Sequence, residues 1–219
     1  MPDGATDLQI WDWDLATFVD RTASADPTPG GGSASMVSAA IGLGLVLMAL
    51  RVTAGNASDR DREALDPLLR SGEILREELS AHAVADLDVF EAYLAALGLP
   101  KRTEEERSVR QERLDQALRA ATEVPLNAAQ SSLEGLDLAR QAVHLCDDTI
   151  VSDVGAGAAL LNGALTATLY NVDVNLKGLK DALQRAHYQT SRDHLQRVAD
   201  ERHQTIRRVL ASRLSPDAK

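Results

Sequence analysis

The chain has 219 residues, a formal net charge of −10 and only 3% aromatic residues. Its richness in alanine and leucine favours packed helices, because strands prefer aromatic and β-branched residues. The acidic balance argues against nucleic acid and anionic membranes as partners, since proteins that bind them are normally basic. The single cysteine, Cys146, excludes an intrachain disulfide framework and suits a reducing compartment, so a cytoplasmic location is expected.

The first part of the chain divides into a loose segment and a short helix. Residues 1–9 contain proline, glycine and two aspartates and are expected to be flexible, with no secretory signal. Between Asp14 and Ala23, the apolar residues Leu15, Phe18 and Val19 recur at helical spacing. This spacing predicts a short amphipathic helix.

A glycine-rich loop follows, with the sequence Pro27-Thr28-Pro29-Gly30-Gly31-Gly32-Ser33. The prolines stiffen the approach, and the glycines permit backbone angles and ligand approaches that a side chain would forbid. Ser33 is predicted to cap a helix beginning near Ala34, whose free N–H groups can hold an anion or a polar heteroatom. The alternative is a plain loop before a buried helix, because the loop completes no phosphate-binding fingerprint.

The helix after this loop is uncharged up to Leu50 and is expected to end near Thr53. Because it is apolar on all sides, it is predicted to be the central helix of a bundle. Its apolar run over residues 36–50 is short for a membrane span. Gly42 and Gly44 predict a close approach by a neighbouring helix.

Apolar periodicity predicts four further helices, over about residues 60–97, 103–147, 152–179 and 181–214. Thr103 with Glu106 matches a capping box, and Pro125 predicts a kink. Ser152 or Asp153 is expected to cap the helix over residues 152–179. The whole chain, residues 1–219, is therefore predicted to be one all-α domain, a helical bundle with buried small-residue helices.

The predicted helix over residues 152–179 carries unusual polar groups. Asn162, Asn171 and Asn175 lie within it, and the last two are four residues apart, so their amides project from one face. Burying an amide without partners costs about 1–3 kcal/mol, so these side chains need hydrogen bonds. Bonds to neighbouring helices and bonds to a ligand both remain open.

Five more motifs follow the glycine-rich loop in chain order. They are Asp86-Leu87-Asp88-Val89-Phe90, Leu99-Pro100-Lys101 with the acidic run after it, Ala121 to Leu126, Ser152-Asp153-Val154-Gly155, and Asn171-Val172-Asp173-Val174-Asn175-Leu176. Together, in this order and at this spacing, the motifs resemble the cyclodeaminase/cyclohydrolase family of folate enzymes. That family includes the cyclodeaminase half of formiminotransferase-cyclodeaminase and the stand-alone methenyltetrahydrofolate cyclohydrolases of some bacteria.

The resemblance implies an all-helical homodimer or larger homo-oligomer, with a site for reduced folate near subunit contacts. It implies an enzyme that hydrolyses 5,10-methenyltetrahydrofolate to 10-formyltetrahydrofolate, or one that cyclises 5-formiminotetrahydrofolate with release of ammonia. A stand-alone chain slightly favours the hydrolysis. Neither reaction strictly needs a metal or redox cofactor, and five histidines without an i, i+4 pair predict no zinc site.

The resemblance also gives roles to individual residues. A carboxylate beside the amidinium-like carbon can stabilise charge and act as a base, and the candidates are Asp153 and Asp86. These carboxylates, the glycine-rich loop and the asparagines are expected to meet around one flat heterocycle. The alternatives are a helix cap for Asp153 and a solvated helix face for Asp86. Substrate binding is expected from the two asparagines of the apolar helix and from the loop, namely Asn171, Asn175, Pro29, Gly30, Gly31, Gly32 and Ser33.

Lys101 is expected to receive the glutamate tail of the folate, together with the neighbouring arginines Arg102, Arg107 and Arg110. The alternative is a charged surface in which these residues alternate with glutamates. The family commonly has a lysine-rich stretch and a tyrosine where this chain has Gly55-Asn56-Ala57-Ser58-Asp59. That departure supports an alternative function, a non-catalytic helical dimer that retains the family scaffold and binds folate or another small ligand.

Overall fold

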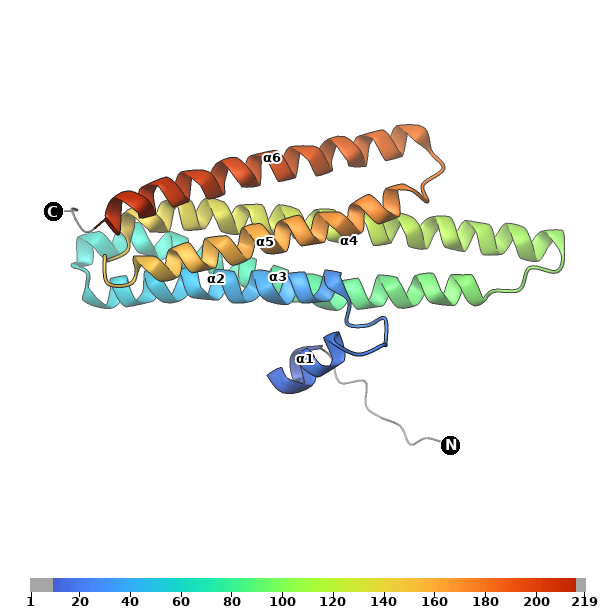
Figure 1. Ribbon diagram of the computed structural model, residues 1–219, viewed down its shortest axis with the longest axis horizontal. Helices are drawn as coiled ribbons and strands as arrows, with labels where there is room; N and C mark the ends of the chain where they lie inside the picture. Colours follow the sequence, from blue (N-terminus) through green and yellow to red (C-terminus); the bar gives the residue numbers. More distant parts are fainter. Residues whose placement is uncertain (1–9, 216–219) are drawn as a thin grey trace.

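The computed structural model describes residues 10–215, and the expected flexibility of residues 1–9 lies outside that range. The described residues form helices and no strand, which confirms the all-α class (Figure 1). A short 3-10 turn precedes six α-helices, with the bounds Ile10–Asp12, α1 Leu15–Thr22, α2 Gly31–Asn56, α3 Asp59–Gly98, α4 Glu104–Leu145, α5 Val151–Leu176 and α6 Ala182–Arg213.

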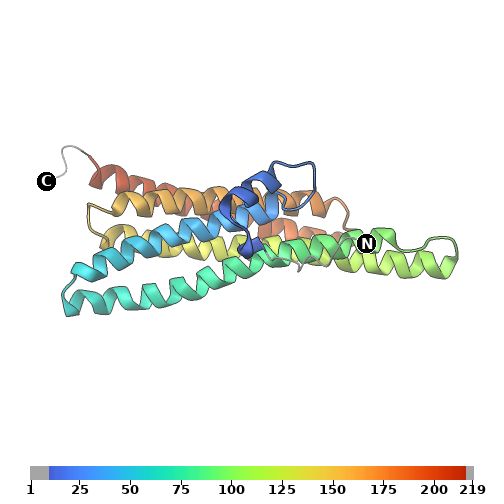
Figure 2. The same ribbon diagram turned by 90° about the horizontal axis from the view of Figure 1, so that it is seen from below.

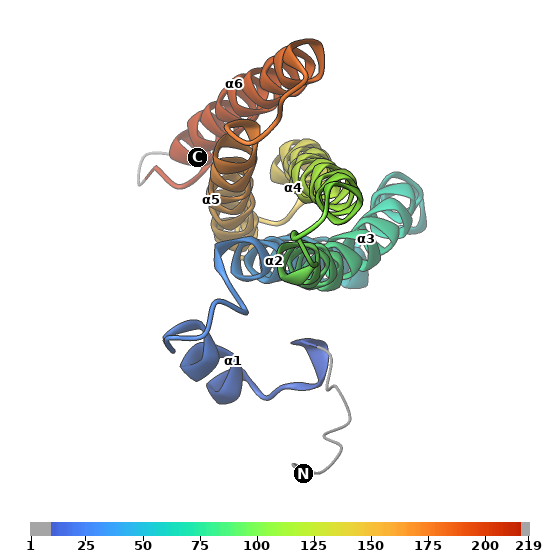
Figure 3. The same cartoon turned by 90° about the vertical axis from the view of Figure 1, so that its right-hand side faces the viewer.

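Helices α2 to α5 form an antiparallel bundle, and α6 covers α4 and α5 from outside (Figure 3). The hairpin of α3 and α4 projects beyond the ends of α2 and α5 (Figures 1 and 2). The chain before α2 is attached by Ile10, which is buried against Met36 and Ala83, and by the Trp11 indole N–H, which donates to the Ser80 carbonyl at 2.9 Å. The capping box at Thr103 and Glu106 is confirmed.

Two glycines let α2 and α5 pack at backbone contact. A Cβ on Gly42 would lie 2.8 Å from the Gly157 carbonyl oxygen, and a Cβ on Gly157 would lie 2.8 Å from the Val46 side chain. The predicted close approach is thus confirmed at Gly42, whereas Gly44 faces open space and the prediction there is wrong. Because the helices run antiparallel, the first turn of α2 lies beside the last turns of α5.

Helix α2 is long and apolar enough to cross a membrane by composition alone. In the fold it is the central helix, and Leu43, Val46, Leu47 and Leu50 are fully buried in the main core. Its composition is therefore explained by contact with three other helices.

Several predicted helix ends differ from those observed. Helix α2 begins at Gly31 with Gly30 as its N-cap, so Ser33 does not cap it and lies in its first turn. Helix α5 begins at Val151 without a side-chain cap, so the capping role of Ser152 or Asp153 is also wrong. In both cases the helix starts earlier than its polar residue, because these N-terminal turns are stabilised by packing rather than by a local cap.

Candidate functional site

A cavity of about 490 Å³ lies where the glycine-rich loop meets the C-terminal end of α5. Helices α3 and α4 close its other sides. Such a volume suits a drug-sized organic ligand. The residues that line it with polar, aromatic or backbone groups are Thr28, Gly30, Gly31, Gly32, Asp86, Phe90, Tyr93, Asn171 and Asn175.

The carboxylate of Asp86 is held against the first turn of α2. The Ser33 hydroxyl, which is fully buried, donates to Asp86 Oδ2 at 2.7 Å. A Cβ on Gly32 would lie 2.6 Å from the Asp86 carboxyl carbon and closer still to both oxygens. Only glycine therefore fits at position 32 with this carboxylate in place. The group that comes close to the glycine-rich loop is thus the Asp86 side chain of the protein itself.

Burial raises the pKa of the Asp86 carboxyl above the ordinary value of 3.8, while the hydroxyl and backbone N–H of Ser33 act to lower it. The positive end of the α2 dipole also favours the ionised form. A carboxyl with a raised pKa, on a cavity wall and with one oxygen fixed, can accept a proton and return it. The structure thus supports Asp86 as a site residue rather than as part of a solvated helix face.

The two asparagines predicted to bind substrate both line the cavity, but their amides differ in what they bind. The Asn175 side-chain nitrogen donates to the Ala121 carbonyl on α4 at 2.6 Å. The Asn171 side-chain nitrogen is buried and has no hydrogen-bond partner among the described residues. Of the two readings left open by the sequence, inter-helix bonding therefore holds for Asn175 and does not account for Asn171.

Asp153 does not line this cavity. It lies in the first turn of α5, 18 positions before Asn171, which is about 27 Å away at 1.5 Å per residue. The expectation that Asp153 and the glycine-rich loop share one cavity is therefore not met within the chain, and a catalytic role for Asp153 stays a sequence-based prediction. The departure from the family pattern at Ala57 lies at the C-cap of α2, also far from the loop.

Lys101 is exposed in the link between α3 and α4 and does not line the cavity. The neighbouring Arg107 donates to the Lys101 and Arg102 carbonyls and pairs with Glu104, and Arg110 donates to the Leu97 carbonyl. The arginines of this cluster therefore bind backbone carbonyls and a glutamate at the tip of the hairpin, and the contact of Lys101 with a glutamate tail stays a prediction. Pro29 and Ser33 are buried behind the cavity wall and are not part of its lining.

Sequence reasoning gave no site role to Phe90 and Tyr93. With Asp86 they stand at i, i+4 and i+7 on α3, so one helix face presents a carboxylate and two aromatic rings to the cavity. That spacing was the available signal. Leu118 and Ala121 on α4 carried no such signal, because they lie in a long amphipathic helix and reach the cavity only through the register of the bundle.

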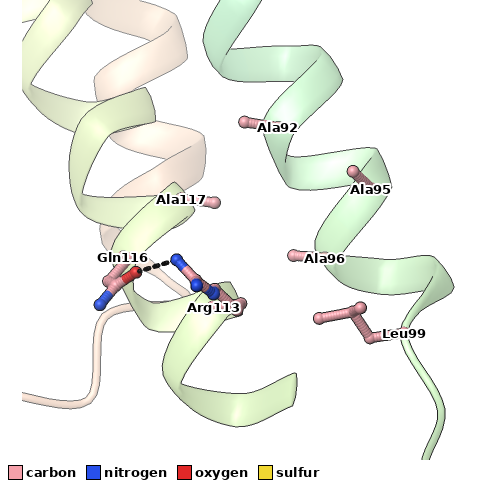
Figure 4. A pocket seen from close by; sticks show the side chains of 7 residues that line it. All are labelled: Ala92, Ala95, Ala96, Leu99, Arg113, Gln116 and Ala117. Atoms are coloured by element: carbon pink, nitrogen blue, oxygen red, sulfur yellow. Dashed lines mark hydrogen bonds between the residues drawn. The ribbon is translucent and has the colours of Figure 1, made fainter. Parts of the chain in front are cut away.

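The structure also contains other hollows, two of which are lined by charged or histidine side chains. The one in Figure 4 lies between α3 and α4 in the projecting hairpin and is lined largely by alanines. Its polar groups are Arg113 and Gln116, which hydrogen-bond each other at 3.4 Å, and no carboxylate lines it. Within residues 10–215 no group of three or more histidines, cysteines or carboxylates is arranged to hold a metal ion.

Comparison with known proteins gives consistent findings. A sequence profile of formiminotransferase-cyclodeaminase matches residues 14–194. The methenyltetrahydrofolate cyclohydrolase of Methylorubrum extorquens is 38% identical over 168 residues, which cover 76% of this chain and 81% of that protein. The formimidoyltransferase-cyclodeaminase of Mus musculus is 30% identical over 83% of this chain, which spans only 34% of the mouse protein. A solved structure of a formiminotetrahydrofolate cyclodeaminase from Thermotoga maritima is 22% identical in sequence to this chain. The structural match covers 92% of this chain and 98% of that one, and the TM-score of 0.81 shows a shared fold.

Proposed function

We propose that this chain, which belongs to the formiminotransferase-cyclodeaminase family, hydrolyses 5,10-methenyltetrahydrofolate to 10-formyltetrahydrofolate. It is an enzyme of folate one-carbon chemistry, of the cyclohydrolase or cyclodeaminase type. The observation that carries the proposal is Asp86, a carboxyl with a raised pKa on the wall of a cavity that also holds aromatic and amide groups. Hydrolysis is favoured over the cyclodeaminase reaction because the match to the cyclohydrolase covers 81% of that relative's length.

The cavity lining suits a flat, polar heterocycle. Phe90 and Tyr93 offer ring faces or edges for stacking, and Val174 and Leu118 offer apolar contact. The amide of Asn171 offers hydrogen-bonding groups at the same wall. A reduced pterin has both kinds of surface, a planar apolar face and a polar edge.

In the hydrolysis, Asp86 acts as the proton carrier. Its carboxylate takes a proton from a water molecule as the water oxygen bonds to the methenyl carbon between N5 and N10. The tetrahedral intermediate then loses its hydroxyl proton to solvent as the carbonyl forms, the bond from this carbon to N5 breaks, and Asp86 returns its proton to N5. One proton is released overall, and the formyl group remains on N10. The raised pKa of Asp86 suits it to both steps.

The cyclisation of 5-formiminotetrahydrofolate is the second candidate, because relatives that include a cyclodeaminase match most of this chain. In that reaction N10 attacks the carbon of the protonated formimino group and loses its proton to a nearby carboxylate. The resulting acid gives that proton to the leaving nitrogen, the bond from the carbon to this nitrogen breaks, and ammonia departs. Asp86 can both take up and return that proton. The two reactions share a tetrahedral carbon flanked by nitrogens and differ in the leaving group.

The two candidates are separated by assaying the purified protein with each folate. Loss of methenyltetrahydrofolate absorbance above the uncatalysed rate, without ammonia release, is expected. Ammonia release from the formimino substrate with no hydrolysis would favour the cyclodeaminase. Folate binding with no turnover of either compound would favour a non-catalytic scaffold.

We also propose that no metal or redox cofactor takes part, since proton transfer by a side chain is sufficient for this chemistry. Dialysis against EDTA is expected to leave the hydrolysis rate unchanged, and a loss that a divalent ion restores would contradict this. A cytoplasmic location and a single-domain organisation belong to the same proposal. The buried free thiol of Cys146 is consistent with a reducing compartment.

The chain is further proposed to form a homodimer through α2 and α5. Large apolar side chains on these helices are exposed, with Ile41 at 51%, Tyr170 at 60% and Val174 at 64%, and Met48 and Leu160 are also exposed. Exposed apolar side chains on two adjacent helices are typical of an interface. A second copy is the occupant that a closed two-fold assembly provides.

Sedimentation equilibrium tests the dimer. The unmodified protein is expected to sediment as a dimer and Ile41→Glu as a monomer. Val109→Glu is the matched control, because Val109 is exposed to a similar degree, 49%, but lies on the projecting hairpin. A monomeric unmodified protein, or equal dissociation by both variants, would contradict the interface.

Ser33→Ala is expected to move the acidic limb of the kcat/KM profile to higher pH. The Ser33 hydroxyl lowers the pKa of Asp86, so its removal raises that pKa further. A base must be ionised, so activity then falls at a higher pH as the solution is acidified. The matched control is Ser38→Ala, because the Ser38 hydroxyl donates only to Ala34 of its own helix. An unmoved limb would exclude Asp86 as the titrating group.

A further inference from the structure

The amides of Asn171 and Asn175 stand one helical turn apart on the same cavity wall. At this spacing on a helix the Cβ atoms are about 5–6 Å apart, so two neighbouring atoms of one ligand can be reached by both side chains. Their present bonding differs. Asn175 is tied through its nitrogen to Ala121, and the Asn171 nitrogen has no acceptor in the part of the chain that the structure describes.

The bond from Asn175 to Ala121 fixes the orientation of its amide. With the nitrogen committed to a backbone carbonyl at 2.6 Å, the group left for a ligand is the oxygen Oδ1, which can only accept. Among residues 10–215 no acceptor holds the buried Asn171 nitrogen, so the amide can rotate and bring its NH2 group toward an incoming acceptor. The wall therefore holds one amide whose free group is an acceptor and, beside it, one amide whose donor is uncommitted.

We propose that the two asparagines together recognise a cyclic amide edge of the ligand, with Asn171 donating to the carbonyl oxygen and Asn175 Oδ1 accepting from the adjacent ring N–H. This inference rests on the proposed folate function, in which the ligand ring is a reduced pterin whose lactam has these two groups side by side. An unmet buried donor is costly, so a ligand with an acceptor at this position relieves the Asn171 amide on binding. Asn171 is then a specificity-determining residue.

The donor at position 171 predicts discrimination between two ring types. A 4-oxo pterin places an acceptor opposite Asn171, whereas a 4-amino pterin places a donor there. A site built to hydrogen-bond one group rejects an analogue that leaves its buried polar group unpaired. The affinity of the unmodified protein for the 4-oxo ring is therefore expected to exceed its affinity for the 4-amino ring by about 10-fold or more.

The test measures inhibition of methenyltetrahydrofolate turnover by folic acid and by its 4-amino analogue, in the unmodified protein, Asn171→Asp and Asn171→Leu. Asn171→Asp replaces the donor by an acceptor of the same shape and is expected to reduce or reverse the preference for the 4-oxo ring.

Asn171→Leu is expected to raise KM for the substrate about 10-fold or more, with a smaller change in kcat. Asn162→Asp is the matched control, because Asn162 lies in the same helix with an unpartnered amide oxygen but does not line the cavity.

Unchanged KM and unchanged ring preference in both Asn171 variants would overturn the inference, while turnover by the unmodified protein would still uphold the proposed function. If neither analogue inhibits, the inference is tested by the KM of the two Asn171 variants for the substrate. KM values equal to that of Asn162→Asp would overturn the inference. Turnover of neither folate by the unmodified protein would overturn the proposed function and this inference together. Thermal unfolding of each variant shows whether a loss reflects the site or the fold.

Discussion

Asn in place of Asp86 is expected to lower kcat by about 10²- to 10⁴-fold, the usual contribution of a positioned general acid or base. The asparagine side chain has the same shape, and its oxygen can still accept the hydrogen bond from the Ser33 hydroxyl. The first turn of α2 therefore keeps its partner while the proton carrier is lost. Rates at neutral pH measure the effect, and Asp88→Asn, an exposed position two residues away, is the matched control.

The stability of the same variant gives an independent check. Because burial raises the folded-state pKa of Asp86 above its unfolded value, the folded protein binds the proton more tightly. Asp86 therefore destabilises the fold most above its folded-state pKa, where it is charged, and the penalty fades as the pH falls from that pKa to the unfolded value. Asp86→Asn is expected to have a Tm equal to or above that of the unmodified protein at pH 7, with the difference shrinking in acid.

Asp86→Ala distinguishes the catalytic role from a purely structural one. The alanine removes both the proton carrier and the acceptor that pairs with Ser33, which leaves a buried hydroxyl without its partner. A loss of about 1–3 kcal/mol in unfolding free energy is expected for alanine and not for asparagine. Full activity in Asp86→Asn would mean that Asp86 serves only the helix terminus. Equal destabilisation by both substitutions would mean that the asparagine does not keep the hydrogen bond with Ser33.

The sequence alone was sufficient to predict those parts of the site that follow from local patterns, namely the glycines and the asparagines. A run of three glycines before an apolar helix indicated a close approach, and two asparagines at i, i+4 on an apolar helix indicated amides in need of partners. The glycine at position 32 meets a carboxylate that follows 54 positions later, and no local pattern could say which side chain would come so close. The register of α3 against α2 decides it.

The placement of Asp153 beside Asn175 conflicted with the predicted helix itself. If residues 152–179 form one helix, Asp153 and Asn175 are 22 positions and about 33 Å apart, so one small ligand cannot contact both in the same chain. Helical rise could have excluded that pairing from the sequence. The bond from Asn175 to Ala121 could not be foreseen, because it depends on how α4 and α5 align in the bundle.

Gly32→Ala is expected to lower kcat/KM by about 10²-fold, comparable to misplacing a catalytic group by about 1 Å. The new methyl group would lie 2.6 Å from the Asp86 carboxyl carbon, so the carboxylate must move from its bond with Ser33. Helix propensity acts in the opposite direction, because alanine is favoured over glycine in a helix by about 0.5–1 kcal/mol. The two effects on stability therefore partly offset each other, and activity is the sensitive readout.

Gly55→Ala is the matched control for this substitution. Gly55 lies in the same helix, and a Cβ there meets nothing within 4 Å, so only the propensity gain applies. Its kcat/KM is expected to stay at the unmodified value while its Tm rises slightly. If Gly32→Ala retains full activity and an unmoved acidic limb, the carboxylate of Asp86 need not stand against the first turn of α2 for turnover. The proton carrier would then have to be sought at another residue.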